Sequence, residues 1–422
     1  MKMDRRQFLK AGAAGVAATG LAGCAGMGGT ASKARVAVVG GGYGGATAAR
    51  YIRMLDPGIE VVLIEPNEAF VSCPISNMVL GGFKTMAEIT TPYSGLARHG
   101  IRIVRDTATA IDVEKKQVRL ARGDPVAFDR VIVSPGIDFM WEALPGMASA
   151  EAQARVLHAW KAGPQTEQLR RQLEAMPDGG VYVLTVPLAP YRCPPGPYER
   201  ACQVAAYFKA AKPRSKVLVL DENPDVSSKG PLFKKAWAEL YQGIIEYRGN
   251  SKTTDVDAAA RTAKLEFGDQ KGDVLNVLPP MKAGAIAAPF ITANRRWCEV
   301  DWLTFESKAA KNVHVLGDSL QIAPAMPKSA TMANGHGKVC AAAVVALLNG
   351  EAPNPSPTLI NTCYSMVSDK LSIHVASVHK YDTRDRTFKA VPGSGGVSAA
   401  MNEAEGAYTM NWARNIWADT LG

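Results

Sequence analysis

Two of the seven cysteines stand in contexts that could support redox chemistry. Cys193 lies in the proline-rich segment 191–200, directly after an apolar strand predicted over 180–186. We therefore expect it at the carboxyl edge of a sheet, where ligands bind in α/β proteins. The neighbouring Arg192 would favour the thiolate form of this cysteine. Cys363 follows a proline-rich linker. Two such thiols could form a redox disulfide, but spacing alone does not establish which cysteines pair.

The remaining cysteines carry no metal or haem pattern. The sequence contains no Cys-x-x-Cys-His haem-attachment motif and no Cys/His group with metal-ligand spacing. Cys340 lies in an apolar helical stretch and is interpreted as packing, and Cys202 and Cys298 are interpreted as structural. The sequence therefore predicts no metal site and no haem attached to this chain.

A glycine motif near the start of the chain is typical of dinucleotide binding. The apolar strand 35–39 runs into Gly40, Gly42 and Gly45, which have G-x-G-x-x-G spacing, and a helical stretch follows. Glycines at this spacing allow a tight turn, close approach of a pyrophosphate and close packing of helix on strand. A second strand ends at Glu65, whose carboxylate is placed to accept from adenosine ribose hydroxyls.

A distant element indicates that the dinucleotide is FAD. The strand 312–316 leads directly into Gly317 and Asp318, and a helix is predicted over 329–348. In flavoproteins with two dinucleotide-binding domains, an element of this kind brings an Asp to the ribityl chain and a helix N-terminus to the flavin ring. Segment 129–136 similarly resembles the strand and turn that return from the interrupting hairpin in those proteins.

The second predicted nucleotide-type domain lacks a phosphate-binding turn. The strand 180–186 continues into the proline-rich segment 187–197, and no G-x-G-x-x-G follows. Prolines supply no N–H groups for a pyrophosphate. The sequence therefore predicts that NAD(P)H is not the reductant.

Several segments resemble the flavin-binding subunit of flavocytochrome c sulfide dehydrogenase, and the similarity runs nearly continuously from about residue 33 to residue 422. They are Arg192–Arg200, Leu359–Ser365, Phe70–Asn77, Trp160–Gly163, Thr304–Ser307, Met326–Ser329 and Pro392–Val397.

This resemblance implies roles for individual residues. Cys193 and Cys363 would form a redox-active disulfide beside the flavin, and Glu199 would accept a proton. Cys73 would be bonded covalently to the flavin, although the residues that flank it depart somewhat from the family pattern. Lys328 is placed among the cofactor-binding residues. Sulfide would open the disulfide, and the electrons would pass through FAD to a c-type cytochrome on a separate chain.

The expected fold class is α/β, with two Rossmann-like domains arranged as in glutathione reductase and a small α+β C-terminal domain. The FAD-binding domain would comprise residues 33–145 and 280–350, and the second domain residues 146–279. The C-terminal domain, 351–422, would carry one active cysteine and end in a helix over 400–421. Two tryptophans of this helix, Trp412 and Trp417, are interpreted as core residues rather than as part of a docking surface.

Residues 1–30 are interpreted as an export signal. Arg5 and Arg6 precede a short, weakly apolar run, which is typical of a Tat signal and too short to span a membrane. The segment 21–24 also matches a lipobox, so Cys24 is either lipidated or part of the discarded peptide. The protein is expected in the periplasm, with membrane contact only if Cys24 is lipidated. The net charge of +9 comes from scattered Lys and Arg residues, which argues against nucleic-acid binding.

Two alternative functions remain open at this stage. A sulfide:quinone oxidoreductase would use the same disulfide but favour an apolar, membrane-dipping C-terminus, whereas the end of this chain carries Asn411, Arg414, Asn415 and Asp419. A flavin-bearing accessory protein of thiosulfate oxidation would reactivate a carrier protein instead of oxidising free sulfide.

Overall fold

The first sheet is parallel and carries the glycine motif at its centre. In the computed structural model, which describes residues 32–422, its strand order is β19-β9-β1-β2-β5. Valine and isoleucine fill these strands because both faces of the sheet are covered. The strands are β1 (Ala34–Val39), β2 (Ile59–Ile64), β5 (Arg102–Val104), β9 (Arg130–Val133) and β19 (Val313–Val315).

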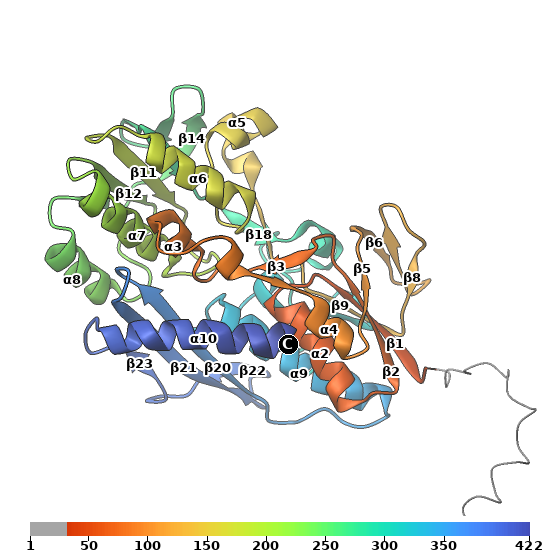
Figure 1. The fold of residues 1–422 in the computed structure, drawn as a ribbon. Coiled ribbons are helices and arrows are strands. Elements are labelled where there is room, and N and C mark those ends of the chain that lie inside the picture. Colours follow the sequence, from red (N-terminus) through yellow and green to blue (C-terminus); the bar gives the residue numbers. More distant parts are fainter. Residues whose placement is uncertain (1–31) are drawn as a thin grey trace, which may run out of the picture. The chain divides into compact units, whose positions relative to one another are not determined.

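Two helices lie together against this sheet. Helix α2 (Tyr43–Leu55) starts at the glycine turn and packs along α9 (Ala330–Leu348) (Figure 1). Helix α9 begins where the sequence predicts, because Ser329 caps it by accepting a hydrogen bond from the Met332 amide at 3.1 Å.

The second sheet is also parallel, with strand order β13-β12-β11-β17. The strands are β11 (Val181–Val186), β12 (Lys216–Asp221), β13 (Ile245–Arg248) and β17 (Val274–Val277). The accompanying helices are α6 (Pro164–Ala175), α7 (Gly196–Ala211) and α8 (Gly230–Leu240). Helix α7 follows β11 across the proline-rich turn, so its start lies at the carboxyl edge of the sheet.

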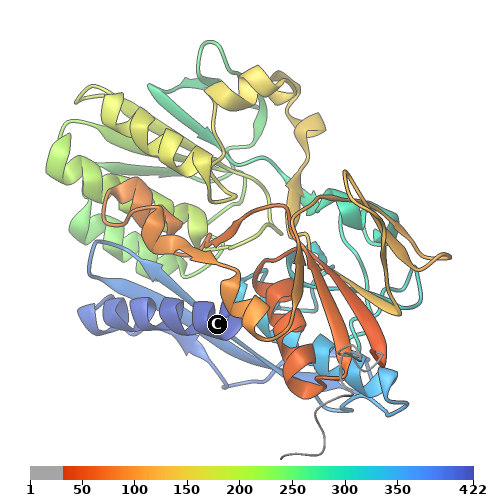
Figure 2. The same cartoon turned by 45° about the vertical axis from the view of Figure 1, so that its right-hand side comes forward.

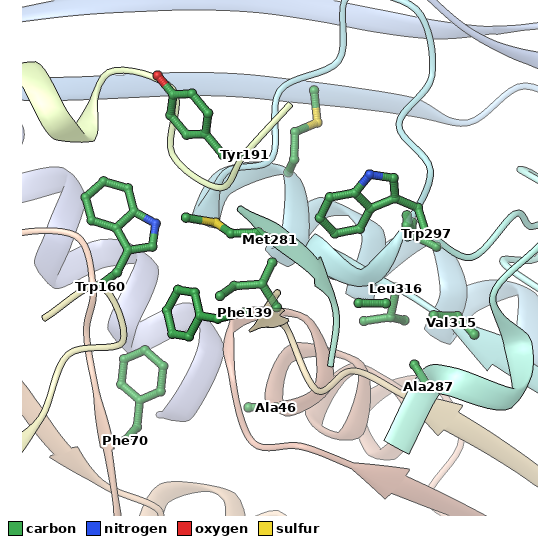
Figure 3. Packing of buried hydrophobic residues seen from close by; sticks show 14 of the residues in the cluster. Ala46, Phe70, Phe139, Trp160, Tyr191, Met281, Ala287, Trp297, Val315 and Leu316 are labelled. Carbon is green, nitrogen blue, oxygen red and sulfur yellow. The ribbon is translucent and has the colours of Figure 1, made fainter. Parts of the chain in front are cut away.

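An antiparallel pair, β10 (Ile137–Phe139) with β18 (Met281–Ala283), joins the two sheets. The largest core cluster continues through this junction, and Figure 3 shows part of it, including Phe139, Trp160 and Met281. The smaller elements are β3 (Ala69–Val71), α3 (Ser76–Gly81), β4 (Thr90–Pro92), α4 (Ser94–Arg98), β6 (Ala108–Asp112), β7 (Gln117–Leu120), β8 (Val126–Ala127), α5 (Ala150–Arg155), β14 (Thr253–Asp257), β15 (Thr262–Leu265) and β16 (Asp269–Lys271).

The C-terminal part is an antiparallel sheet with one long helix, α10 (Glu403–Leu421), across it (Figure 2). The helix starts three residues later than the sequence pattern predicts, because Asn402 caps it by accepting from the Glu405 amide at 2.8 Å. The strands are β20 (Thr358–Met366), β21 (Ser372–Asp382), β22 (Thr387–Ala390) and β23 (Gly396–Val397).

The predicted α/β fold class is confirmed. Residues 34–422 form one compact unit, so the predicted domain ranges stay a prediction. Within residues 32–422, no helix is long and apolar enough to cross a membrane, and no group of three or more His, Cys, Asp or Glu side chains could hold a metal ion. The predicted export signal and Cys24 lie outside the described residues.

Candidate active site

A cavity of ≈ 640 Å³ lies where the elements of all three parts of the fold meet. Its wall runs from the glycine turn and Glu65, past Cys73, to Cys193, Glu199 and Cys363. Residues from the two ends of the sequence therefore share one site. A cavity of this size matches the range of cofactor and small-molecule sites.

The three motif glycines have the separate structural roles that their spacing predicts. Gly40 has a φ of +100°, and a Cβ there would lie 2.4 Å from the Ser134 carbonyl oxygen. A Cβ at Gly45 would lie 2.0 Å from the Gly40 oxygen, so this residue permits the close packing of helix on strand. At Gly42 nothing lies within 4 Å of a Cβ, because this position faces the cavity. The start of α2 is thus open to a phosphate group.

Glu65 is fixed against the glycine turn. Its carboxylate accepts from the Gly41 amide at 2.8 Å, from the Asn67 amide at 2.9 Å and from the Asn67 side chain at 2.6 Å. The residue is buried and lines the cavity. Its binding of a ribose stays a prediction.

Gly317 and Asp318 line the cavity, whereas Lys328 does not. The Lys328 Nζ donates to the Asp318 carbonyl at 2.9 Å and to the Leu320 carbonyl, and it lies 3.6 Å from the centroid of the Trp297 ring. Its ammonium holds the loop that carries Asp318. Direct contact of Lys328 with the cofactor stays a prediction. Burial raises the pKa of Asp318.

Cys193 and Cys363 both line the cavity, and their thiols interact electrostatically. Cys193 is in the left-handed region, with φ +58°, and its amide donates to the Lys328 carbonyl at 2.9 Å. The Cys363 thiol, in β20, donates to Asn361 Oδ1 at 3.4 Å. The pairing of these two cysteines in a disulfide stays a prediction. Burial raises the pKa of both thiols, and the charges of Glu199 and Cys363 raise the pKa of Cys193 further.

Glu199 lies on the first turn of α7, and its carboxylate is buried beside the pair. It accepts from Asn77 Nδ2 at 2.9 Å and from the Met366 amide at 2.8 Å. Burial raises the pKa of this carboxyl, and the two hydrogen bonds oppose the rise. A carboxylate with a raised pKa is suited to accept a proton near neutral pH.

Cys73 is held between the first sheet and the start of α6. Its Sγ accepts from the Ala162 amide at 3.4 Å, and the Arg192 guanidinium lies beside it. The sulfur is thus held in place by a backbone donor and a neighbouring guanidinium. Ile75 has a φ of +74°, which is costly for a β-branched residue and fixes the path of this loop.

The C-terminal helix supports the Cys73 loop through a chain of hydrogen bonds. Trp417 Nε1 donates to the Tyr43 hydroxyl at 3.0 Å, and that hydroxyl lies 2.7 Å from Ser72 Oγ. Ser72 in turn donates to the Pro74 carbonyl at 2.7 Å. Both tryptophans are half-buried and pack on a smaller core cluster, Trp417 also packs on the main core, and Trp412 also lines the cavity.

Three further polar residues of the site were not singled out from the sequence. Arg200 is buried and donates to Asn77 Oδ1 at 3.0 Å and to Asn276 Oδ1 at 2.8 Å. Asn77 and Arg200 belong to segments that carry the family resemblance, and membership in those segments could have identified them as site residues. Lys229 stands in a turn without any recognisable pattern.

In the second sheet, the carboxylate of the acidic residue at the end of β12 accepts hydrogen bonds from neighbouring side chains. Asp221 accepts from the Tyr198 hydroxyl at 2.7 Å, the Tyr247 hydroxyl at 3.1 Å and Asn223 Nδ2 at 2.7 Å. In dinucleotide-binding domains an acidic residue at a strand end of this kind binds the ribose. Here the carboxylate is already hydrogen-bonded to side chains of the protein.

Comparisons with known proteins agree with this geometry. Residues 166–279 match the model for the central part of the sulfide dehydrogenase [flavocytochrome c] flavoprotein chain, and residues 355–421 match its flavin-binding part. A sulfide dehydrogenase [flavocytochrome c] flavoprotein chain from Chlorobaculum thiosulfatiphilum is 64% identical over 45 residues, which are 11% of this chain and 94% of that sequence. The chain belongs to this family. The resemblance predicted from sequence motifs is thereby confirmed.

Other matches cover further parts of this family member. Residues 34–174 match the pyridine nucleotide-disulphide oxidoreductase model, and residues 2–22 match the Tat signal model, which supports export to the periplasm. The mitochondrial sulfide:quinone oxidoreductase of Mus musculus is 24% identical over 67% of this chain and 65% of its own length. This chain thus spans a little under two thirds of that relative.

The fold has a close counterpart among solved structures. The sulfide:quinone oxidoreductase of Aquifex aeolicus superposes with a TM-score of 0.72 at 16% identity, covering 92% of this chain and 91% of the other. With the flavin-binding match, the open glycine turn and Glu65 fit FAD as the cofactor. The prediction of FAD is confirmed, while its covalent attachment is not shown.

Proposed function

We propose that this flavoprotein oxidises sulfide at the Cys193–Cys363 pair and passes the electrons to a c-type cytochrome on a separate chain. The main observation in support is that two cysteines 170 positions apart in the sequence line one cavity together with the glycine turn. Family membership supports the same substrate and partner.

The cysteine pair would supply the chemistry on sulfur. Hydrosulfide forms a bond to one Sγ of the oxidised pair, the bond between Cys193 and Cys363 breaks, and the other cysteine leaves as a thiolate. A second hydrosulfide removes the outer sulfur of the resulting persulfide as a hydrodisulfide, which leaves two reduced cysteines. FAD, when bound, accepts the two electrons that restore the disulfide and can release them singly to a haem.

Glu199 would take the proton that hydrosulfide releases. Its carboxylate is buried, faces the cavity and interacts electrostatically with Cys193. Asn77 and the Met366 amide keep it oriented toward the pair.

We expect Glu199→Gln to slow sulfide oxidation by about a hundredfold or more, the usual contribution of a positioned general base. The wild-type rate should fall as the pH drops through the raised pKa of Glu199, because a protonated carboxyl accepts no proton. The variant should lack this acidic limb in a pH profile of sulfide-dependent turnover. Glu239→Gln, on the exposed face of α8, is the matched control and should keep it. An unchanged profile in Glu199→Gln would remove this role.

Cys73 would attach the flavin. A thioether between its Sγ and the flavin 8α-methyl carbon requires loss of the thiol proton and one methyl hydrogen, with two electrons passing to dioxygen or to the cytochrome. The Ala162 amide and the Arg192 guanidinium hold the Cys73 sulfur at the cavity wall, where the flavin would lie. Covalent attachment would prevent cofactor loss in the periplasm.

We also propose that NAD(P)H is not a reductant of this protein. The occupied Asp221 carboxylate and the proline-rich turn after β11 support this. Tethering to the membrane is proposed only through lipidation of Cys24, which lies outside the described residues.

The electron acceptor separates the proposed function from its nearest alternative. The matches to sulfide:quinone oxidoreductases favour quinone reduction as the second candidate. Purified protein should be mixed with sulfide and either a soluble c-type cytochrome or a short-chain quinone. The proposal predicts faster reduction of the cytochrome; a quinone rate that exceeds it would assign the alternative.

A further inference from the structure

Lys229 is a buried cation next to the cysteine pair but outside the cavity wall. The residue is 7% exposed and adopts a left-handed conformation, with φ +55°, at the start of α8. A buried ammonium is costly unless its N–H groups and its charge are compensated. The surroundings of Lys229 therefore indicate what this charge is for.

The hydrogen bonds of the Lys229 ammonium go to the C-terminal sheet. Its Nζ donates to the Cys363 carbonyl at 3.0 Å, to Ser365 Oγ at 2.8 Å and to the Ile373 carbonyl at 3.4 Å. A residue of the second sheet's α8 thus anchors the strand β20 at the position of the active cysteine.

The charges that face Lys229 come from three other elements. They are Cys363 on β20, Cys193 and Glu199 at the start of α7, and Glu405 on α10. Burial lowers the pKa of Lys229 to about 8, and these acidic groups oppose the fall. The ammonium is therefore largely protonated at neutral pH.

Among the interactions that favour a charged Cys363, the largest comes from this lysine. Burial raises the pKa of Cys363, and the interaction with Lys229 is the largest that lowers it, ahead of Asn361 and Ser329. Glu199 acts in the opposite direction. Lys229 also lowers the pKa of Cys193, after Arg192.

We propose that Lys229 is a positioning residue of the dithiol pair, whose ammonium fixes the part of β20 that carries Cys363 and stabilises the thiolate of that cysteine. The inference deepens the proposed function and rests on it for its purpose. Whichever sulfur hydrosulfide attacks, opening the disulfide leaves one thiolate in a buried site. A fixed cation beside it stabilises that charge, and a thiol of lower pKa leaves faster.

The test is a titration of Cys363 in the flavin-loaded protein, in which Cys193→Ser leaves this thiol without its disulfide partner. The ultraviolet absorbance of the thiolate is followed against pH, with Cys193→Ser/Cys363→Ser subtracted. Adding Lys229→Gln removes the charge but keeps a donor, and should raise the Cys363 midpoint by about one pKa unit, a tenfold loss of thiolate at a given pH. Lys229→Arg should restore it.

Ser365→Ala serves as the matched control, because it removes one hydrogen bond of Lys229 but keeps the ammonium. A purely structural lysine would give equal shifts in Ser365→Ala and Lys229→Gln, and this result would overturn the proposal. An unmoved midpoint in Lys229→Gln would do the same. Lys229→Met replaces Lys229→Gln if the latter fails to fold, with the same expected shift. Because the titration needs no sulfide, it stands even if sulfide oxidation is not the reaction.

Discussion

Serine in place of Cys193 or Cys363 is expected to lower sulfide oxidation by at least about a thousandfold, the scale of losing an essential nucleophile. Both cysteines line the cavity, and a single remaining thiol cannot form the bond that sulfide opens. FAD should stay bound, because the glycine turn and Glu65 are untouched. Stopped-flow absorbance of the flavin after anaerobic mixing with sulfide measures the rate.

Cys340→Ala provides the control for losing a cysteine as such. This residue is fully buried in α9 and does not line the cavity. Its variant should react with sulfide at close to the wild-type rate. Rapid flavin reduction in either serine variant would show that sulfide reacts elsewhere.

Alanine at Cys73 is expected to convert a covalently held flavin into an extractable one. After acid precipitation, wild-type protein should remain yellow and the Cys73→Ala supernatant should carry the colour. The expected change is from nearly complete retention to nearly complete release, because the thioether is a single bond made by a single sulfur. Absorbance of both fractions is the measurement.

Cys298→Ala is the corresponding control, since Cys298 is buried and does not line the cavity. It should retain the flavin as wild-type protein does. A yellow supernatant from wild-type protein would contradict the assignment of Cys73.

Replacing Trp417 by Phe, which removes only its donor to Tyr43, should leave the attachment intact if Arg192 and the Ala162 amide hold the sulfur in place.

The parts of the site that the sequence predicts are those governed by local backbone constraints. Gly40 and Gly45 are identifiable because a Cβ at either position would meet backbone atoms of the turn, which restricts the residue type there. The start of α9 is readable because Ser329 is a good N-cap in front of an apolar helical run. The buried parallel strands are readable from their runs of valine and isoleucine.

Features of the site that depend on packing between distant segments could not be predicted from local sequence patterns. The proximity of Cys193 and Cys363 depends on how β20 reaches the start of α7, which no spacing encodes. The contacts of Lys328 were not predicted either, because its ammonium donates to carbonyls of the 318–320 loop and lies against the Trp297 ring, and no local pattern encodes this packing. No sequence pattern indicated a role for Lys229, since its hydrogen-bond partners lie on strands more than a hundred residues away in sequence.

Peptide mapping of the isolated protein before and after anaerobic addition of sulfide tests the central claim most directly. Oxidised protein should yield a peptide that links Cys193 to Cys363. After one equivalent of sulfide, that linked peptide should disappear and one of the two cysteines should carry an additional sulfur atom. Cysteines that are never linked, or an additional sulfur atom carried by a cysteine other than these two, would contradict the account.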